Sequence, residues 1–166
     1  MEELTVEEII KYVVRIEQES YQFYRKASKI LEGNEIKLLT DELAELKVEH
    51  VNQLKGLLNE ETITLEDLTY VLNIDTSLFD RIIQTHEIPA QATTLDILSI
   101  ALEREKNTQK NYEMLLTITA LNVKIIRAFS LLKGIEETHV KKIAERIKKM
   151  RLAHCQNGAT SFGCGL

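Results

Sequence analysis

Residues 132–147, LKGIEETHVKKIAERI, place a carboxylate and an imidazole within the apolar stripe of one long helix. The apolar positions recur at steps of three and four, which is the period of an α-helix. Glu136 follows Leu132 by four residues and His139 follows it by seven, so both fall within the stripe. Charge on the buried face of a helix is costly unless it is paired or binds a cation. This stretch therefore indicates a helical bundle with a polar site in its core.

The same pattern occurs twice along the chain. Residues 43–58, LAELKVEHVNQLKGLL, align with it, so that His50 corresponds to His139 and Lys47 to Glu136. A second pair of stretches also aligns: residues 17–24, EQESYQFY, with residues 105–112, EKNTQKNY. The chain therefore resembles two duplicated helical hairpins.

Helical phase selects the polar side chains that point into the bundle. Glu17 and Glu105 each lie four residues after an apolar position, as Glu136 does, so they share the buried phase. The inward set comprises Glu17, Lys47, His50, Glu105, Glu136 and His139. Neighbouring acids are predicted to be solvated, namely Glu19, Glu45, Glu49 and Glu103. Carboxylates and imidazoles that converge in an apolar bundle are ligands for Fe, Mn or Zn.

The fold class is all-α, with four long helices. They are predicted at Val6–Leu31, Glu35–Leu58, Leu95–Ala120 and Val123–Leu152, behind caps at Thr5, Asn34, Thr93 or Thr94, and Asn122. Short joins within each pair make antiparallel hairpins, and residues 59–93 are long enough to cross the bundle. Two short helices are expected in that crossover, at Leu65–Leu72 and Ser77–Glu87. Residues 1–154 form the bundle domain, and residues 155–166 are predicted to be a flexible tail rich in Gly.

The composition excludes several classes of protein. The chain has 166 residues, 44% of them hydrophobic, which suffices for one domain with a core. It carries 21 Lys and Arg against 26 Asp and Glu, and a net charge of −5 disfavours nucleic acid and anionic membranes as partners. No apolar run approaches the roughly 20 residues of a membrane helix. The opening residues MEELTVEEII lack the basic region of a secretory signal, so we expect a cytoplasmic protein.

The two aligned motifs resemble those of the rubrerythrin-like branch of the ferritin-like di-iron superfamily. That family places a Glu seven residues before a Tyr on the first and third helices, here Glu17 with Tyr24 and Glu105 with Tyr112. It places Glu-x-x-His on the second and fourth helices. The fourth is intact in this chain, whereas the second has Lys47 in place of the Glu. The resemblance covers residues 5–150.

The resemblance implies a ferritin-like four-helix bundle with non-haem iron, one or two ions, although Zn or Mn would also suit the ligands. It implies peroxide reduction or ferroxidation, an external electron donor, and a homodimer or larger assembly. Full rubrerythrins carry a rubredoxin domain built on paired Cys-x-x-Cys motifs, and this chain has none. The family's extra carboxylate on the third helix is replaced by Thr108.

Lys47 alters the expected site. Three Glu and one Lys leave two negative charges, which balance one divalent ion. The ammonium could replace a metal, held by Glu17 and one oxygen of Glu136; Lys47 could instead be neutral, or turn outward so that Glu49 swings in. Only one site, formed by Glu105, Glu136 and His139, is expected to keep all its ligands.

Three functions remain open from the sequence: a redox-active iron protein, a weakly catalytic protein with one metal, and a metal-free interaction module in which Lys47 replaces the metal. Whether the chain is an enzyme is open as well. Cys155 and Cys164 are either two free thiols or, with His154, a redox or metal-binding pair.

Overall fold

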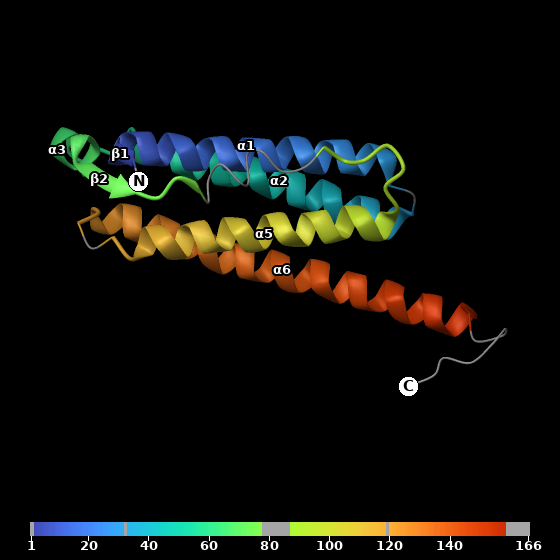
Figure 1. Ribbon diagram of the computed structural model, residues 1–166. Helices are drawn as coiled ribbons and strands as arrows, with labels where there is room; N and C mark the ends of the chain where they lie inside the picture. Colours follow the sequence, from blue (N-terminus) through green and yellow to red (C-terminus); the bar gives the residue numbers. More distant parts are fainter. Residues whose placement is uncertain (1, 32, 78–86, 119, 159–166) are drawn as a thin grey trace.

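The computed structural model describes residues 2–31, 33–77, 87–118 and 120–158. Four long helices form the bundle: α1 (Val6–Ile30), α2 (Asn34–Leu57), α5 (Thr94–Leu116) and α6 (Val123–Gly158). Helix α1 pairs with α2 and α5 pairs with α6, each pair antiparallel across a short join (Figure 1). The all-α bundle of two hairpins that the sequence predicts is confirmed.

Threonine residues cap the starts of three of the described helices. Thr5, Thr64 and Thr93 each accept a hydrogen bond from the third helical residue, whose carboxylate in turn accepts one from the cap backbone. Asn34 is not a cap, because Gly33 takes that position with a φ of 99°, which suits glycine. Helix α5 ends at Leu116, four residues before the predicted end at Ala120.

The crossover contains a short helix and a strand. Helix α3 (Leu65–Thr69) ends earlier than the predicted Leu72, and strand β2 (Val71–Ile74) follows it. Strand β2 pairs antiparallel with β1 (Glu2–Thr5). The all-helical reading of residues 70–72 is therefore wrong, because pairing with a distant segment outweighs a local helical pattern. The predicted helix at 77–87 falls largely outside the described residues.

The two described ends of the crossover lie at opposite ends of the bundle (Figure 1). Helix α3 and β2 lie beside the start of α1, and residues 87–93 lead into the start of α5 at the far end. Leu68 and Leu72 pack against the core, as expected for a crossover that covers the bundle, whereas Val71 is half exposed.

The apolar core consists of two layers, one toward each end of the bundle. The first is built around Val13, Leu54 and Phe129, and the second around Tyr24, Leu43 and Ile143. In α1 the first layer extends to Ile16 and the second begins at Phe23. The side chains between these layers are therefore shielded from water on both sides.

Helix α6 is longer than predicted and projects beyond the end of the bundle (Figure 1). Residues 155–158, assigned above to the tail, belong to this helix. Arg151 and Cys155 on the projecting part are exposed. In the described part of the chain, no helix combines the length and apolar character that a membrane span requires.

Candidate metal centre

Six polar side chains meet between the two apolar layers. Glu17 comes from α1, Glu105 from α5, Lys47 and His50 from α2, and Glu136 and His139 from α6. Each is at most 1% exposed. All six residues that helical phase places inside the bundle thus lie in one buried cluster. That they bind metal stays a prediction.

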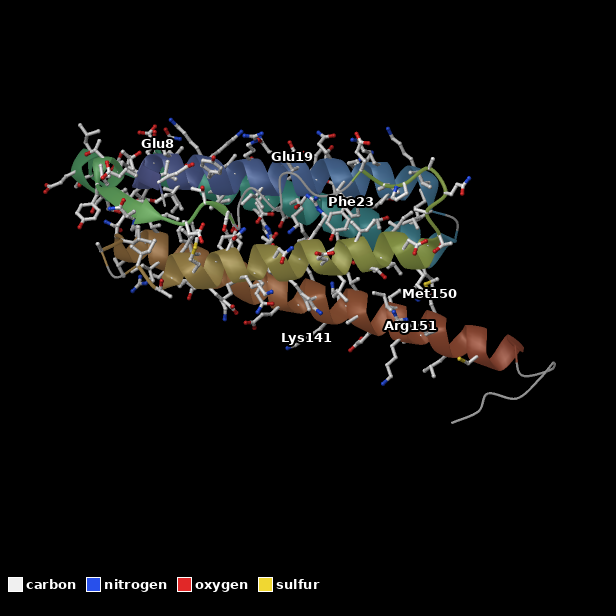
Figure 2. The ribbon with its side chains drawn as sticks, viewed as in Figure 1. Glu8, Glu19, Phe23, Lys141, Met150 and Arg151 are labelled. Atoms are coloured by element: carbon white, nitrogen blue, oxygen red, sulfur yellow. The ribbon has the colours of Figure 1, made fainter. Side chains whose placement is uncertain are left out.

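Neighbouring acids point away from the cluster, as the phase argument requires. Glu45, Glu49 and Glu103 are exposed. Figure 2 shows Glu19 on the outer side of α1 and Phe23 between α1 and α5. The inward charges are thus specific positions rather than the edge of a polar face.

The Lys47 ammonium lies among all three carboxylates. Its Nζ is 3.2 Å from Glu17 Oε2 and donates to Glu105 Oε2 at 3.1 Å. It also donates to both oxygens of Glu136, at 2.8 and 3.0 Å. The expected contacts to Glu17 and Glu136 are present, and Glu105 adds a third carboxylate that the sequence did not suggest.

Lys47 is charged. Burial alone would lower its pKa, but the carboxylates of Glu105, Glu136 and Glu17 raise it above the ordinary value. This geometry excludes an outward Lys47, and the three facing carboxylates favour the charged form over the neutral one. Burial would likewise raise the pKa of Glu17, but the nearby ammonium and His50 lower it to about 2.

Two histidines flank the ammonium with their rings stacked, 5.9 Å between centroids. His139 Nδ1 lies 3.0 Å from Glu105 Oε2 and 3.2 Å from Glu136 Oε2. His50 Nδ1 lies 3.2 Å from Glu136 Oε1 and 3.5 Å from Glu17 Oε2. Burial opposes protonation, yet the facing carboxylates raise the pKa of His50 to about 9 and raise that of His139 as well.

Two tyrosines hold the outer carboxylate oxygens, each from the opposite hairpin. The Tyr24 hydroxyl donates to Glu105 Oε1 and the Tyr112 hydroxyl donates to Glu17 Oε1, both at 2.7 Å. Burial and the neighbouring carboxylates hold the pKa of both tyrosines well above its usual value, so they remain donors. Each terminal Glu is thereby oriented with Oε2 toward the cluster.

Within the described residues, two groups of three side chains have the spacing of a metal site. One is Glu17, His50 and Glu136, and the other is Glu105, Glu136 and His139. In each group the ligand atoms lie within 4.8 Å of one another. The sequence predicts one complete and one damaged group; in the structure Glu136 directs one oxygen toward each histidine, so both groups contain three potential ligands.

A two-metal centre does not fit these residues. The inner oxygens of all three carboxylates already face the Lys47 ammonium, and the remaining charge of three Glu and one Lys balances only one divalent ion. One ion does fit. Glu17 Oε2 and both His50 nitrogens are buried without a hydrogen-bond partner, and these are donor atoms that iron accepts.

A buried cation that was not predicted from the sequence lies beside the cluster. Arg104 is 2% exposed, donates to Ser20 Oγ at 3.2 Å and lies 5.0 Å from the centre of the Phe23 ring. Burial lowers its pKa. Arg104 adjoins Glu105 but lies about 100° away around the helix, so helical phase gives no signal that it is buried.

Comparisons with known proteins give a structural match. No family model matches the chain, and neither does a curated protein sequence. A crystal structure from Thermotoga maritima, of a protein proposed to be a ferritin-like diiron-carboxylate protein, superposes with a TM-score of 0.70. The sequence identity is 23% over 90% of this chain and 99% of that one. The chain described here therefore has the ferritin-like fold.

Proposed function

We propose that this ferritin-like protein binds one transition-metal ion, iron in the first instance, and uses it in redox chemistry. The observation that carries the proposal is the pair of three-residue carboxylate–histidine groups sharing Glu136 in a water-shielded core. Peroxide reduction and ferroxidation are the two reactions that the resemblance to rubrerythrin-like proteins supports.

Each part of the cluster has a role in this proposal. The carboxylates and histidines would hold the ion, and iron supplies one-electron redox chemistry when bound. Tyr24 and Tyr112 orient the terminal carboxylates. The apolar layers exclude bulk water, and Lys47 keeps a positive charge fixed beside the ligands.

The proposed reaction requires an electron source outside the chain. Reduction of peroxide to two waters consumes two electrons and two protons. The sequence has no Cys-x-x-Cys pair that could form a second iron centre. An external donor is therefore part of the proposal, as is a cytoplasmic location.

Metal analysis tests the proposal directly. Protein purified without chelator is expected to contain about one iron ion per chain. Addition of peroxide to the anaerobic ferrous form is expected to oxidise that iron, followed by its absorbance in the near ultraviolet. Two ions per chain at full occupancy would contradict the assignment of Lys47, and a protein with neither iron nor iron affinity would contradict the metal function.

A metal-free interaction module is the second candidate, and a specific observation favours it. Five of the six carboxylate oxygens in the cluster accept a hydrogen bond from Lys47 or a tyrosine. With both histidines protonated, the three carboxylates would be neutralised without any metal. Under this function, a chelator leaves the melting temperature unchanged and no metal raises it.

Assembly into a homodimer or larger oligomer is also proposed. Leu65, Tyr70 and Val71 gather in the crossover, with exposures of 77%, 49% and 52%. Exposed apolar side chains that are close in sequence and structure are typical of interfaces. Light scattering at micromolar concentration is expected to give at least twice the mass of the 19.1 kDa chain. A Val71→Asp variant is expected to be smaller, and a monomeric wild type would contradict the interface.

A further inference from the structure

The two halves of the cluster are not equivalent, although each has a Glu, a His and a share of Glu136. On the α5–α6 side, both oxygens of Glu105 accept hydrogen bonds, from Tyr24 at 2.7 Å and from Lys47 at 3.1 Å. His139 Nδ1 is within 3.2 Å of two carboxylates in hydrogen-bonding orientation. The polar contacts of this half are made by the protein itself.

The α1–α2 side is less complete. Glu17 Oε2 and both ring nitrogens of His50 have no hydrogen-bond partner, although Glu17 and His50 are at most 1% exposed. Glu17 Oε2 lies 3.2 Å from Lys47 Nζ, and His50 Nδ1 lies 3.5 Å from Glu17 Oε2 and 3.2 Å from Glu136 Oε1. These are ion-pair distances without hydrogen-bonding alignment. Buried polar groups are ordinarily hydrogen-bonded, so these unpaired atoms are positioned to accept a partner such as an ion or a water molecule.

We infer that the ion of the proposed function binds on the α1–α2 side, between Glu17, His50 and Glu136, while the α5–α6 side stays closed by protein contacts. This inference rests on the proposed function and assigns its site within the cluster. It is the reverse of the sequence-based expectation, which placed the ion at Glu105, Glu136 and His139.

A cleft in the surface opens over the same two helices. It has a volume of about 430 Å³ and lies between α1 and α2. Its walls include Gln18 and Val51, which adjoin Glu17 and His50 in sequence, and Lys47 contributes to its lining. Lys47 is the cluster residue in this lining, so the cleft approaches the cluster from the side of α1 and α2.

The donor atoms define the class of ion. Two carboxylate oxygens and one imidazole nitrogen suit Fe²⁺, Mn²⁺, Co²⁺ or Zn²⁺, whereas Ca²⁺ and Mg²⁺ prefer sites made of oxygen alone. Tyr112 binds the outer oxygen of Glu17, so the inner oxygen is the one presented to the ion. The Lys47 ammonium contacts the same inner oxygens, Glu17 Oε2 and Glu136 Oε1, so its positive charge restricts the cluster to a single divalent ion.

Binding of Co²⁺ to paired variants tests the inference, because the two halves supply matched controls. Metal-free His50→Ala and His139→Ala are titrated with Co²⁺, and ions per chain are counted by native mass spectrometry. His50→Ala is expected to weaken binding by roughly tenfold or more, the range that even indirect partners of a metal reach. His139→Ala is expected to weaken it by much less. An equal loss in the two variants, or the reverse order, overturns the inference.

A second pair of variants, in which glutamate is replaced by glutamine, tests the inference if a histidine variant fails to fold. Glu17→Gln keeps the acceptor for Tyr112 but removes the charge of the inner oxygen, and Glu105→Gln does the same on the other side. Only Glu17→Gln is expected to weaken Co²⁺ binding strongly. If the wild type binds no Co²⁺, Fe²⁺ or Zn²⁺, the proposed function and this inference both fail. If the wild type binds but the Glu105 and His139 variants lose more, only the inference fails.

Discussion

A Lys47→Glu variant is expected to bind about two metal ions per chain, where the wild type binds about one. In the wild type, one ammonium faces three carboxylates and leaves two negative charges. The substitution removes the ammonium and adds a carboxylate three residues before His50, which completes the second Glu-x-x-His. Four carboxylates balance two divalent ions. The measurement is metal content after anaerobic loading with Fe²⁺ and removal of excess metal.

The same variant is expected to depend on metal for its stability. Without the ammonium, four carboxylates are buried with no lysine among them, and each unpaired buried ion costs several kcal/mol. The metal-free variant should therefore melt well below the metal-free wild type and regain stability when metal is added. Because the metal binds only the native state, it stabilises that state by mass action.

Lys55→Glu is the matched control, because Lys55 is an exposed lysine of the same helix and undergoes the same change of charge. It should leave the ion count at about one. If Lys47→Glu gains no metal, the bundle has repacked around the missing ammonium, and the metal-free module becomes the better account. If Lys55→Glu also gains an ion, the gain reports overall charge and not the cluster.

Helical phase was sufficient to find the cluster, for a physical reason. Each long helix turns by a fixed angle per residue, so a residue four positions after one near the centre of the buried stripe lies only about 40° from it and also faces inward. Glu17 and Glu105 obey this rule, as do Lys47 and Glu136 in the aligned stretches. The rule uses only positions within a single helix, so it applies to each of the four long helices without knowing how they pack.

Phase does not determine how side chains from different helices share their contacts. Glu136 serves both histidines and the lysine because its two oxygens diverge. Tyr24 and Tyr112 each bind the Glu of the other hairpin and not the one seven residues earlier on their own helix. These choices depend on how the hairpins pack, and a single-helix pattern contains no information on that packing.

Strand β2 and the burial of Arg104 could not be predicted for a related reason. Val71–Ile74 is too short for an alternating pattern to stand out, and its pairing with Glu2–Thr5 depends on the crossover bringing distant segments together. Arg104 faces α1 at the edge of the stripe, where its guanidinium lies over Phe23. Cation–π stacking of this kind offsets part of the cost of burial.

Removal of Glu136 is expected to have the largest effect on the native state. Its carboxylate accepts two hydrogen bonds from Lys47 and faces both histidines. A Glu136→Ala variant leaves the ammonium without its shortest contacts in a fully buried position. Loss of one partner of a buried ion pair costs about 3–5 kcal/mol. For a chain of this size that lowers the melting temperature by about 6–20 °C.

Metal binding should be lost in the same variant, because Glu136 is the residue common to both three-residue groups. Glu136→Gln keeps the size of the side chain and removes only its negative charge. It should retain more stability than Glu136→Ala and still lose the metal. Glu137→Ala, a change at the adjacent outward position beside Lys133, should leave metal content and melting temperature close to wild type. A Glu136→Ala protein with an unchanged melting temperature would mean that Glu17 and Glu105 alone hold Lys47. In that case the cluster is organised around the terminal carboxylates, and Glu136 is not its centre.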